Sequence, residues 1–169
     1  YVILCNKGDM PDTSLPKPLC FEEVISSEAS SISWPNLDER AASSLCYTSG
    51  TTGNPKGVLY SHRSILLHTF GMLTFAADVG LTPSSTVLPV VPLFHANAWG
   101  LPFAVPLVGA KLVFPGAALD GASLFSLMDK ERVKAAWGVP TIWLGLLAEM
   151  RKQKRKPQDF SFMLSGGSA

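Results

Sequence analysis

The sequence predicts an α/β fold in which a parallel β-sheet is flanked by helices. Short apolar runs bounded by turn residues alternate with longer segments whose apolar residues recur at helical spacing. Hydrophobic residues make up 47% of the 169 residues, which is enough to build the core of one ordinary domain. This alternation is typical of parallel strands that are connected by crossover helices.

Six short apolar segments are predicted to be strands. They lie near Val2 to Cys5, Leu45 to Thr48, Thr86 to Val90, Lys111 to Phe114, Val133 to Gly138 and Phe162 to Leu164. Residues 6–44 are rich in serine and proline, so we expect a surface excursion over residues 1–44. Residues 45–169 are then the core of the domain.

Four helices are predicted between these strands. The first begins after Ser61, a favourable N-cap residue, and runs toward Asp78. The last begins at Pro140, whose fixed φ suits a first helical turn. The other two cover roughly Ala98 to Leu107 and Ala122 to Arg132.

Composition and charge exclude several classes of function. A net charge of +1 gives no field that favours nucleic acid or an anionic membrane as a partner. The basic cluster Arg151 to Lys156 suits the C-terminus of the last helix. Residues 79–110 lack Asp, Glu, Lys and Arg, but five prolines interrupt them, so no transmembrane segment is predicted.

The three cysteines are widely spaced and form no CxxC pair. Cys5, Cys20 and Cys46 therefore predict neither a disulfide framework nor a zinc site, and we expect a reducing, cytoplasmic location. Charged residues are only 16% of the chain against about 25% in a typical soluble domain. The chain also opens on an apolar run and closes on a glycine loop, so we expect a fragment of a larger protein.

A glycine- and hydroxyl-rich loop with one lysine is the strongest functional signal. Its glycines allow consecutive N–H groups to turn toward one point, and its hydroxyls and lysine add donors and positive charge. These residues are Ser49, Gly50, Thr51, Thr52, Gly53, Lys56 and Gly57. We predict that the loop binds the phosphates of a nucleotide at the carboxyl edge of the sheet. It is not a Walker A loop, because Gly57 stands where that motif needs a hydroxyl residue.

Residues 48–57, T-S-G-T-T-G-N-P-K-G, resemble the signature of the adenylate-forming superfamily at ten consecutive positions. This group includes acyl-CoA synthetases, adenylation domains of peptide synthetases and luciferases. The resemblance implies that Lys56 and the hydroxyls of Ser49, Thr51 and Thr52 contact the β- and γ-phosphates of ATP. It also implies that Thr48 helps to hold Mg²⁺ and that residues 1–169 are part of the large N-terminal AMP-binding domain, without its C-terminal domain.

The segment V-P-L-F-H-A-N-A-W-G, residues 91–100, resembles a second motif of this superfamily. The resemblance implies that His95 helps to position the substrate carboxylate, although an isolated histidine in an apolar stretch is more often a core residue. Trp99 resembles the gate of long-chain fatty acyl-CoA synthetases, where an indole closes an acyl tunnel. A buried core tryptophan is the alternative interpretation.

Two further segments match the superfamily in the same order along the chain. The turn W-G-V-P-T is first of all core, but the resemblance implies that it also lines the acyl pocket, through Gly138, Val139 and Pro140. The loop L-S-G-G-S-A resembles the one beside the adenine and the acyl chain, which includes Gly166, Gly167 and Ser168. His62 and His68 are expected to be helix-surface residues.

The resemblance implies ATP-dependent activation of a medium- or long-chain fatty acid to an acyl-adenylate and then an acyl-CoA. ATP, Mg²⁺ and CoA would be required, and the fragment alone is expected to be inactive. Two alternatives remain open: adenylation of an aryl acid, an amino acid or a sulfur-containing propionate, and a nucleotide-binding module without catalysis. The oligomeric state is also open, and a homodimer is one of the possible states.

Overall fold

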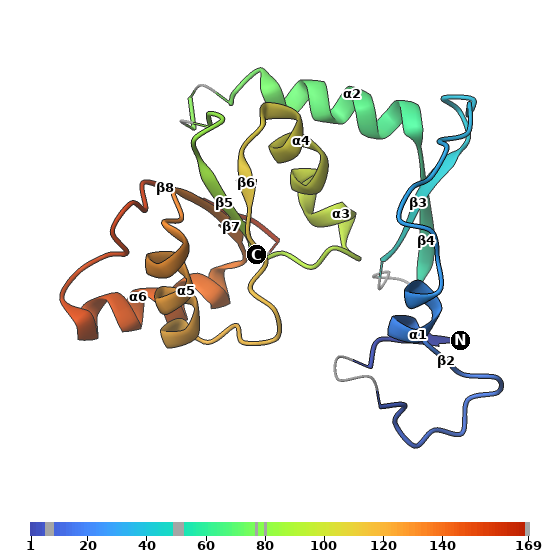
Figure 1. The fold of residues 1–169 in the computed structure, drawn as a ribbon. Helices are drawn as coiled ribbons and strands as arrows, with labels where there is room; N and C mark the ends of the chain where they lie inside the picture. Colours follow the sequence, from blue (N-terminus) through green and yellow to red (C-terminus); the bar gives the residue numbers. More distant parts are fainter. Residues whose placement is uncertain (6–8, 49–52, 77, 80, 168–169) are drawn as a thin grey trace. The chain divides into compact units, whose positions relative to one another are not determined.

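The computed structural model describes residues 1–5, 9–48, 53–76, 78–79 and 81–167, which belong to two compact units (Figure 1). The first unit is Tyr1–Leu37. In it, β1 (Val2–Ile3) pairs in parallel with β2 (Leu19–Cys20), and α1 (Phe21–Ser26) follows directly. The excursion expected over residues 1–44 thus contains a short strand, β2, and a helical segment, α1, that the sequence did not reveal. The second unit begins at Asp38.

A four-stranded parallel sheet forms the centre of the second unit, in the order β6-β5-β7-β8. Its strands are β5 (Thr86–Pro89), β6 (Lys111–Leu112), β7 (Ala135–Gly138) and β8 (Phe162–Ser165). All residues of β5 and β7 are buried, as expected for central strands that are covered on both faces. The predicted α/β fold and these four strands are confirmed.

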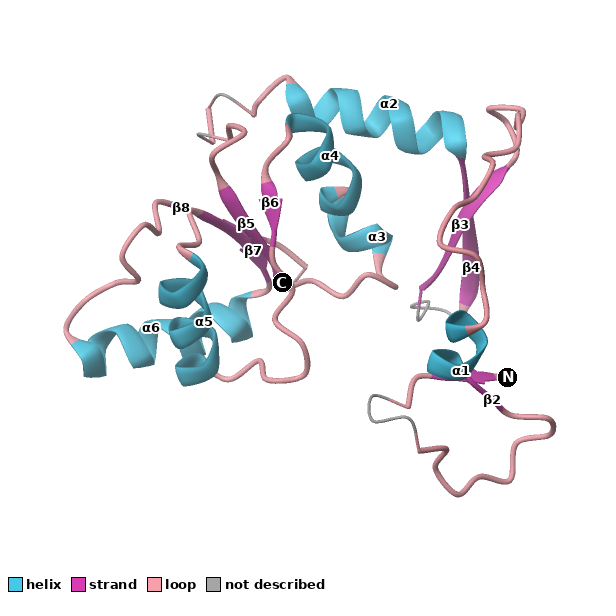
Figure 2. Cartoon of the chain, in the orientation of Figure 1, coloured by secondary structure: helices cyan, strands magenta, loops and turns pink. Residues whose placement is uncertain are grey.

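Two hydrophobic clusters cover the two faces of this sheet. Leu88 and Ala136 face α5 (Gly121–Glu131) and α6 (Pro140–Gln153), whose core residues are Leu124, Phe125, Met128, Trp143 and Leu146. Their neighbours Val87 and Ala135 face the opposite way, toward Leu101 and Val105 of α4 (Leu101–Val108). Figure 2 shows the helices on both sides of the four strands. The alternation follows from the two-residue period of a strand.

Local sequence signals set the starts of the helices. Helix α2 (His62–Leu73) begins after Ser61, whose Oγ accepts the N–H of Ser64 at 3.1 Å, while Ser64 Oγ accepts the N–H of Ser61 at 3.0 Å. Helix α5 begins after Asp120, whose carboxylate accepts the N–H of Ser123 at 3.0 Å. Hydrogen bonding to Ser123 lowers the pKa of Asp120 below its usual value. The predicted start at Pro140 is confirmed, whereas α2 ends at Leu73 rather than near Asp78.

The segment before the glycine-rich loop does not belong to the parallel sheet, which corrects one sequence prediction. Strand β3 (Ala42–Thr48) pairs in antiparallel fashion with β4 (Lys56–Ser61), so that Thr48 lies opposite Lys56. The loop therefore joins the two strands of a hairpin, not a strand to a helix. Residues 56–61 form a strand because their backbone groups find partners in β3, a pairing that the sequence pattern did not indicate.

Two helical glycines provide a matched test of the packing between α5 and α6. A Cβ atom on Gly121 would lie 2.2 Å from the carbonyl oxygen of Gly145, whereas one on Gly71 in α2 would meet nothing within 4 Å. We expect Gly121→Ala to lower the free energy of unfolding by about 1–3 kcal/mol, because the helices must move apart. Gly71→Ala should be neutral or stabilising by up to about 1 kcal/mol. Denaturant unfolding measures both, and equal effects would contradict this packing.

Candidate AMP-binding and acyl-binding site

The loops that follow β7 and β8 pack against each other at the carboxyl edge of the sheet. The N–H of Gly166 donates to the carbonyl oxygen of Gly138 at 3.3 Å. A Cβ atom on Gly138 would lie 2.7 Å from the Trp143 ring, so no larger residue fits there. Gly167 has a φ of +82°, and its Cβ position lies 3.4 Å from a methyl carbon of Val139. These loops form one compact surface where open α/β folds bind their ligands.

The indole of Trp99 lies against this glycine surface. A Cβ atom on Gly166 would be 3.2 Å from the Trp99 ring, and one on Gly167 would be 4.0 Å from it. Trp99 is partly buried and reaches this position from α3 (Ala96–Trp99), which follows β5. The structure therefore brings together Trp99, Gly138, Val139, Gly166 and Gly167, while Pro140 begins α6 beside them.

The segment α3 is a left-handed turn rather than the start of an ordinary helix. Its four residues, Ala96–Trp99, have φ values between +45° and +55°, and Gly100 follows at +80°. The left-handed conformation costs roughly 1–2 kcal/mol for each residue that carries a Cβ atom. The sequence predicted a right-handed helix from about Ala98, which is correct only from Leu101 onward.

Hydrogen bonds from two other elements hold this turn. The Asn97 side chain donates to Ser44 Oγ at 2.9 Å and accepts from Cys46 Sγ at 3.4 Å, and both partners belong to β3. The His68 ring lies on α2, with its Nε2 atom 3.3 Å from the carbonyl oxygen of Trp99. These contacts offset part of the backbone strain, and strain of this kind is concentrated at functional sites.

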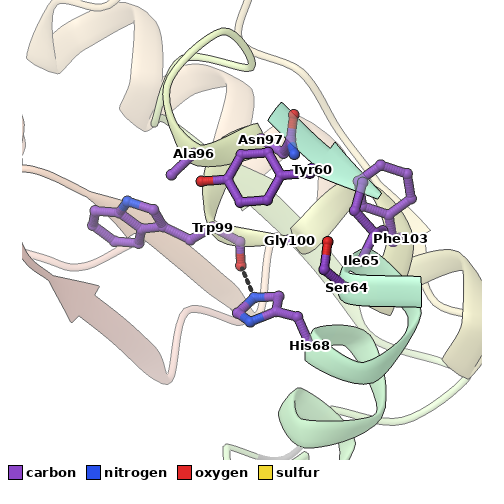
Figure 3. Close-up of a pocket in the computed structure, with 9 residues that line it drawn as sticks. All are labelled: Tyr60, Ser64, Ile65, His68, Ala96, Asn97, Trp99, Gly100 and Phe103. Carbon is purple, nitrogen blue, oxygen red and sulfur yellow. Dashed lines mark hydrogen bonds between the residues drawn. The ribbon is translucent and has the colours of Figure 1, made fainter. Parts of the chain in front are cut away.

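A pocket of about 390 Å³ lies next to the turn (Figure 3). Helix α2, the end of β4 and the segment 96–103 surround it with mostly apolar side chains. Its lining residues are Tyr60, Ser64, Ile65, His68, Ala96, Asn97, Trp99, Gly100 and Phe103. His68 is an exposed residue of α2, as predicted, and its ring also contributes to this pocket. The spacing in the sequence could have indicated this position, because Ser64 and His68 are one helical turn apart and share a face of α2.

The predicted phosphate-binding residues lie at the open end of the hairpin. Thr48 and Lys56 are both exposed, and the hydroxyl of Thr48 donates to the carbonyl oxygen of Lys56 at 3.5 Å. Gly53 has a φ of +144°, which residues with a side chain rarely adopt. The other predicted members, Ser49, Gly50, Thr51 and Thr52, lie outside the described residues, as does Ser168 of the predicted adenine loop. His95 is exposed just before the left-handed turn.

A family model described as "AMP-binding enzyme" matches residues 7–169. The chain belongs to this family. Its glycine-rich loop, its Trp99 turn and its Gly166–Gly167 loop all lie within the matched region. The resemblance to adenylate-forming enzymes is therefore confirmed.

Curated members of the family are similar over most of the chain. A medium-chain-fatty-acid–CoA ligase from Ectopseudomonas oleovorans is 49% identical over 170 residues, which are 100% of this chain and 31% of that protein. A 3-methylmercaptopropionyl-CoA ligase from Ruegeria pomeroyi is 50% identical over 149 residues, 88% of this chain and 28% of that protein. The chain thus spans about a third of the length of the curated relatives it matches.

A solved structure of the family has the same fold. It is o-succinylbenzoate CoA synthetase from Bacillus subtilis in complex with its acyl-adenylate intermediate, with a TM-score of 0.74 and 26% identity. The match covers 90% of this chain and 30% of that one. Within the part of the chain that the structure describes, no helix is long and apolar enough to cross a membrane.

Two glycines with positive φ test the contact between α2 and the left-handed turn. A Cβ atom on Gly100 would lie 2.6 Å from the His68 ring, whereas one on Gly116, at a φ of +67°, would meet nothing within 4 Å. Alanine at either position would pay the cost of a positive φ, because it carries a Cβ atom. We expect Gly100→Ala to lose about 1–2 kcal/mol more, because His68 must move away from the Trp99 carbonyl. Denaturant unfolding measures the difference, and equal losses would refute the contact.

Proposed function

We propose that the protein is an acyl-CoA ligase that activates a medium- or long-chain fatty acid. The observation that carries this proposal is the apolar pocket that Trp99 helps to line, because the indole of the same residue also lies against Gly166. A hydrocarbon chain fits such a lining because burial of each CH₂ group contributes about 0.8 kcal/mol. The relative from Ectopseudomonas oleovorans acts on medium-chain fatty acids, which supports the same substrate class.

The proposed reaction has two steps. A carboxylate oxygen of the acid attacks the α-phosphorus of ATP, and pyrophosphate leaves with the electron pair of the broken P–O bond. The thiolate of CoA then attacks the acyl carbon of the adenylate, and AMP leaves. Both steps depend on holding two anions in line and on offsetting their charge. The Bacillus subtilis relative, whose structure holds an acyl-adenylate, supports the first step.

Each part of the site has a proposed role in this reaction. The mobile ammonium group of Lys56, with the hydroxyls of Ser49, Thr51 and Thr52, would bind the β- and γ-phosphates of ATP. His95 would position the carboxylate of the acid. Gly166, Gly167 and Ser168 would lie beside the adenine, where glycine leaves room for a flat base against the backbone. Trp99 would close the acyl pocket until nucleotide binds.

The residues present suit Mg²⁺ as the metal of this site. Thr48 offers an exposed hydroxyl oxygen at the end of β3, and oxygen is the donor that Mg²⁺ prefers. Thr48 would supply one ligand, because Mg²⁺ in nucleotide sites is held largely by phosphates and water. The ion would neutralise charge on the phosphates, and Lys56 opposite Thr48 adds to the same effect.

A short sulfur-containing acid is the second candidate substrate. The relative from Ruegeria pomeroyi is a 3-methylmercaptopropionyl-CoA ligase, and its identity to this chain equals that of the fatty-acid relative within 1%. A thioether is apolar and would also enter the pocket. Chain length separates the two candidates, because a long acyl chain would fill more of the pocket than a short thioether acid.

Acid-dependent ATP–pyrophosphate exchange and thioester formation by the full-length protein test the proposal. We expect turnover with saturated fatty acids and a rise in kcat/KM with chain length until the pocket is filled. Trp99→Ala should lower kcat/KM for long acids by about tenfold, because the acyl chain would lose binding equivalent to one or two buried CH₂ groups. Trp34→Ala is the matched control, because Trp34 is exposed in the first unit.

Three other outcomes of this assay would change the proposed substrate, the proposed catalysis or the role of Trp99. The highest kcat/KM with 3-methylmercaptopropionate and no gain from longer chains would replace the fatty-acid assignment by the second candidate. Binding of ATP without acid-dependent exchange would make the protein a nucleotide-binding module. Equal effects of the Trp99 and Trp34 variants would remove Trp99 from the acyl pocket.

A further inference from the structure

Three potential metal ligands meet in the first unit, outside the AMP-binding site. They are the Sγ atoms of Cys5 and Cys20 and a carboxylate oxygen of Glu22, and all three lie within 4.8 Å of one another. Among the described residues this is the only such group of His, Cys, Asp or Glu side chains. The wide spacing of the cysteines in the sequence gave no sign of it.

The fold of the first unit brings these side chains together. Parallel pairing places Ile3 of β1 opposite Cys20 of β2, so the residues after β1 reach the start of α1. The N–H of Cys5 donates to Glu22 Oε2 at 2.9 Å, which fixes the carboxylate. The Cys20 thiol donates to the same oxygen at 3.3 Å, and the Cys5 thiol donates to the carbonyl oxygen of Ile3 at 3.4 Å.

We propose that Cys5, Cys20 and Glu22 bind a zinc ion. Two thiolates and a carboxylate suit Zn²⁺, which prefers four tetrahedral ligands with Zn–S distances of about 2.3 Å. Sulfur atoms on such an ion are about 3.8 Å apart, which lies within the 4.8 Å that contains the three ligand atoms. Binding forms two S–Zn bonds and one O–Zn bond and releases the two thiol protons to solvent. A water molecule completes the coordination.

The geometry favours a metal over a disulfide between the same two cysteines. A disulfide needs neither the carboxylate nor its orientation, yet Glu22 Oε2 is held beside both sulfur atoms by a backbone N–H. Hydrogen bonds of this kind fix the ligands of metal sites. Zinc would link the segment after β1 to the end of β2 and the first turn of α1. It would thereby stabilise a unit in which Cys20 is the only buried residue among those described.

Metal titration of the reduced, metal-free full-length protein tests the site. Zn²⁺ is added in competition with a chromophoric chelator, and Cd²⁺ is used in parallel to detect thiolate-to-metal charge-transfer absorption. Cys5→Ser should remove one bound Zn²⁺ per chain and the absorption, whereas Cys46→Ser should leave both unchanged. Glu22→Gln keeps both thiols and should weaken Zn²⁺ binding by at least about tenfold. Glu23→Gln, its neighbour in α1, should change the affinity by less than about twofold.

The opposite results would overturn the proposal. Circular dichroism confirms that each variant is folded, so that loss of metal is not loss of structure. Equal Zn²⁺ affinity of the Glu22 and Glu23 variants, or no difference between wild type and Cys5→Ser, would exclude this ligand set. A Cys5–Cys20 disulfide formed with glutathione disulfide, in a protein whose reduced form takes up no zinc, would identify a redox pair instead.

Discussion

The left-handed turn of Ala96–Trp99 is the constraint on which the candidate site depends. Consecutive left-handed residues with side chains persist only where surrounding contacts outweigh their cost. Asn97 is held by Ser44 and Cys46 of the hairpin, and the carbonyl of Trp99 by His68 of α2. The turn therefore couples the hairpin, whose far end carries Thr48 and Lys56, to the pocket and to the loops at the edge of the sheet.

The order of the strands explains why residues far apart in the sequence meet at this site. Trp99 follows β5, Val139 follows β7 and Gly166 follows β8, and these three strands are neighbours in the sheet. Because the strands are parallel, their carboxyl ends meet at one edge. The hydrophobic clusters on both faces fix β5 and β7. Glycine at 138, 166 and 167 then lets the loops and the Trp99 indole approach closely.

Local signals made most of the fold predictable. The starts of three helices depend on short local signals in the sequence. Ser61 and Asp120 each accept a backbone N–H with the side chain, and Pro140 has a φ that suits a first helical turn. Short apolar runs likewise located the buried strands β5 and β7. The motifs also selected Trp99, Val139 and Gly166, which the structure brings together.

Features that depend on distant partners were not predictable. Strand β4 exists because it pairs with β3, and the left-handed turn because Ser44, Cys46 and His68 hold it. The position of His68 in the pocket depends on how α2 packs against segment 96–103. The meeting of Cys5 with Cys20 and Glu22 depends in the same way on the pairing of β1 with β2.

The central claim is that the turn at Trp99 separates the Gly166–Gly167 loop from an acyl pocket. A crystal structure of the full-length protein with a non-hydrolysable fatty acyl-adenylate analogue tests it most directly. The claim predicts that the adenine lies beside Gly166 and Gly167, that the indole of Trp99 has moved off Gly166, and that the acyl chain lies next to His68 and Phe103. An acyl chain bound elsewhere, with Trp99 still against Gly166, would contradict it.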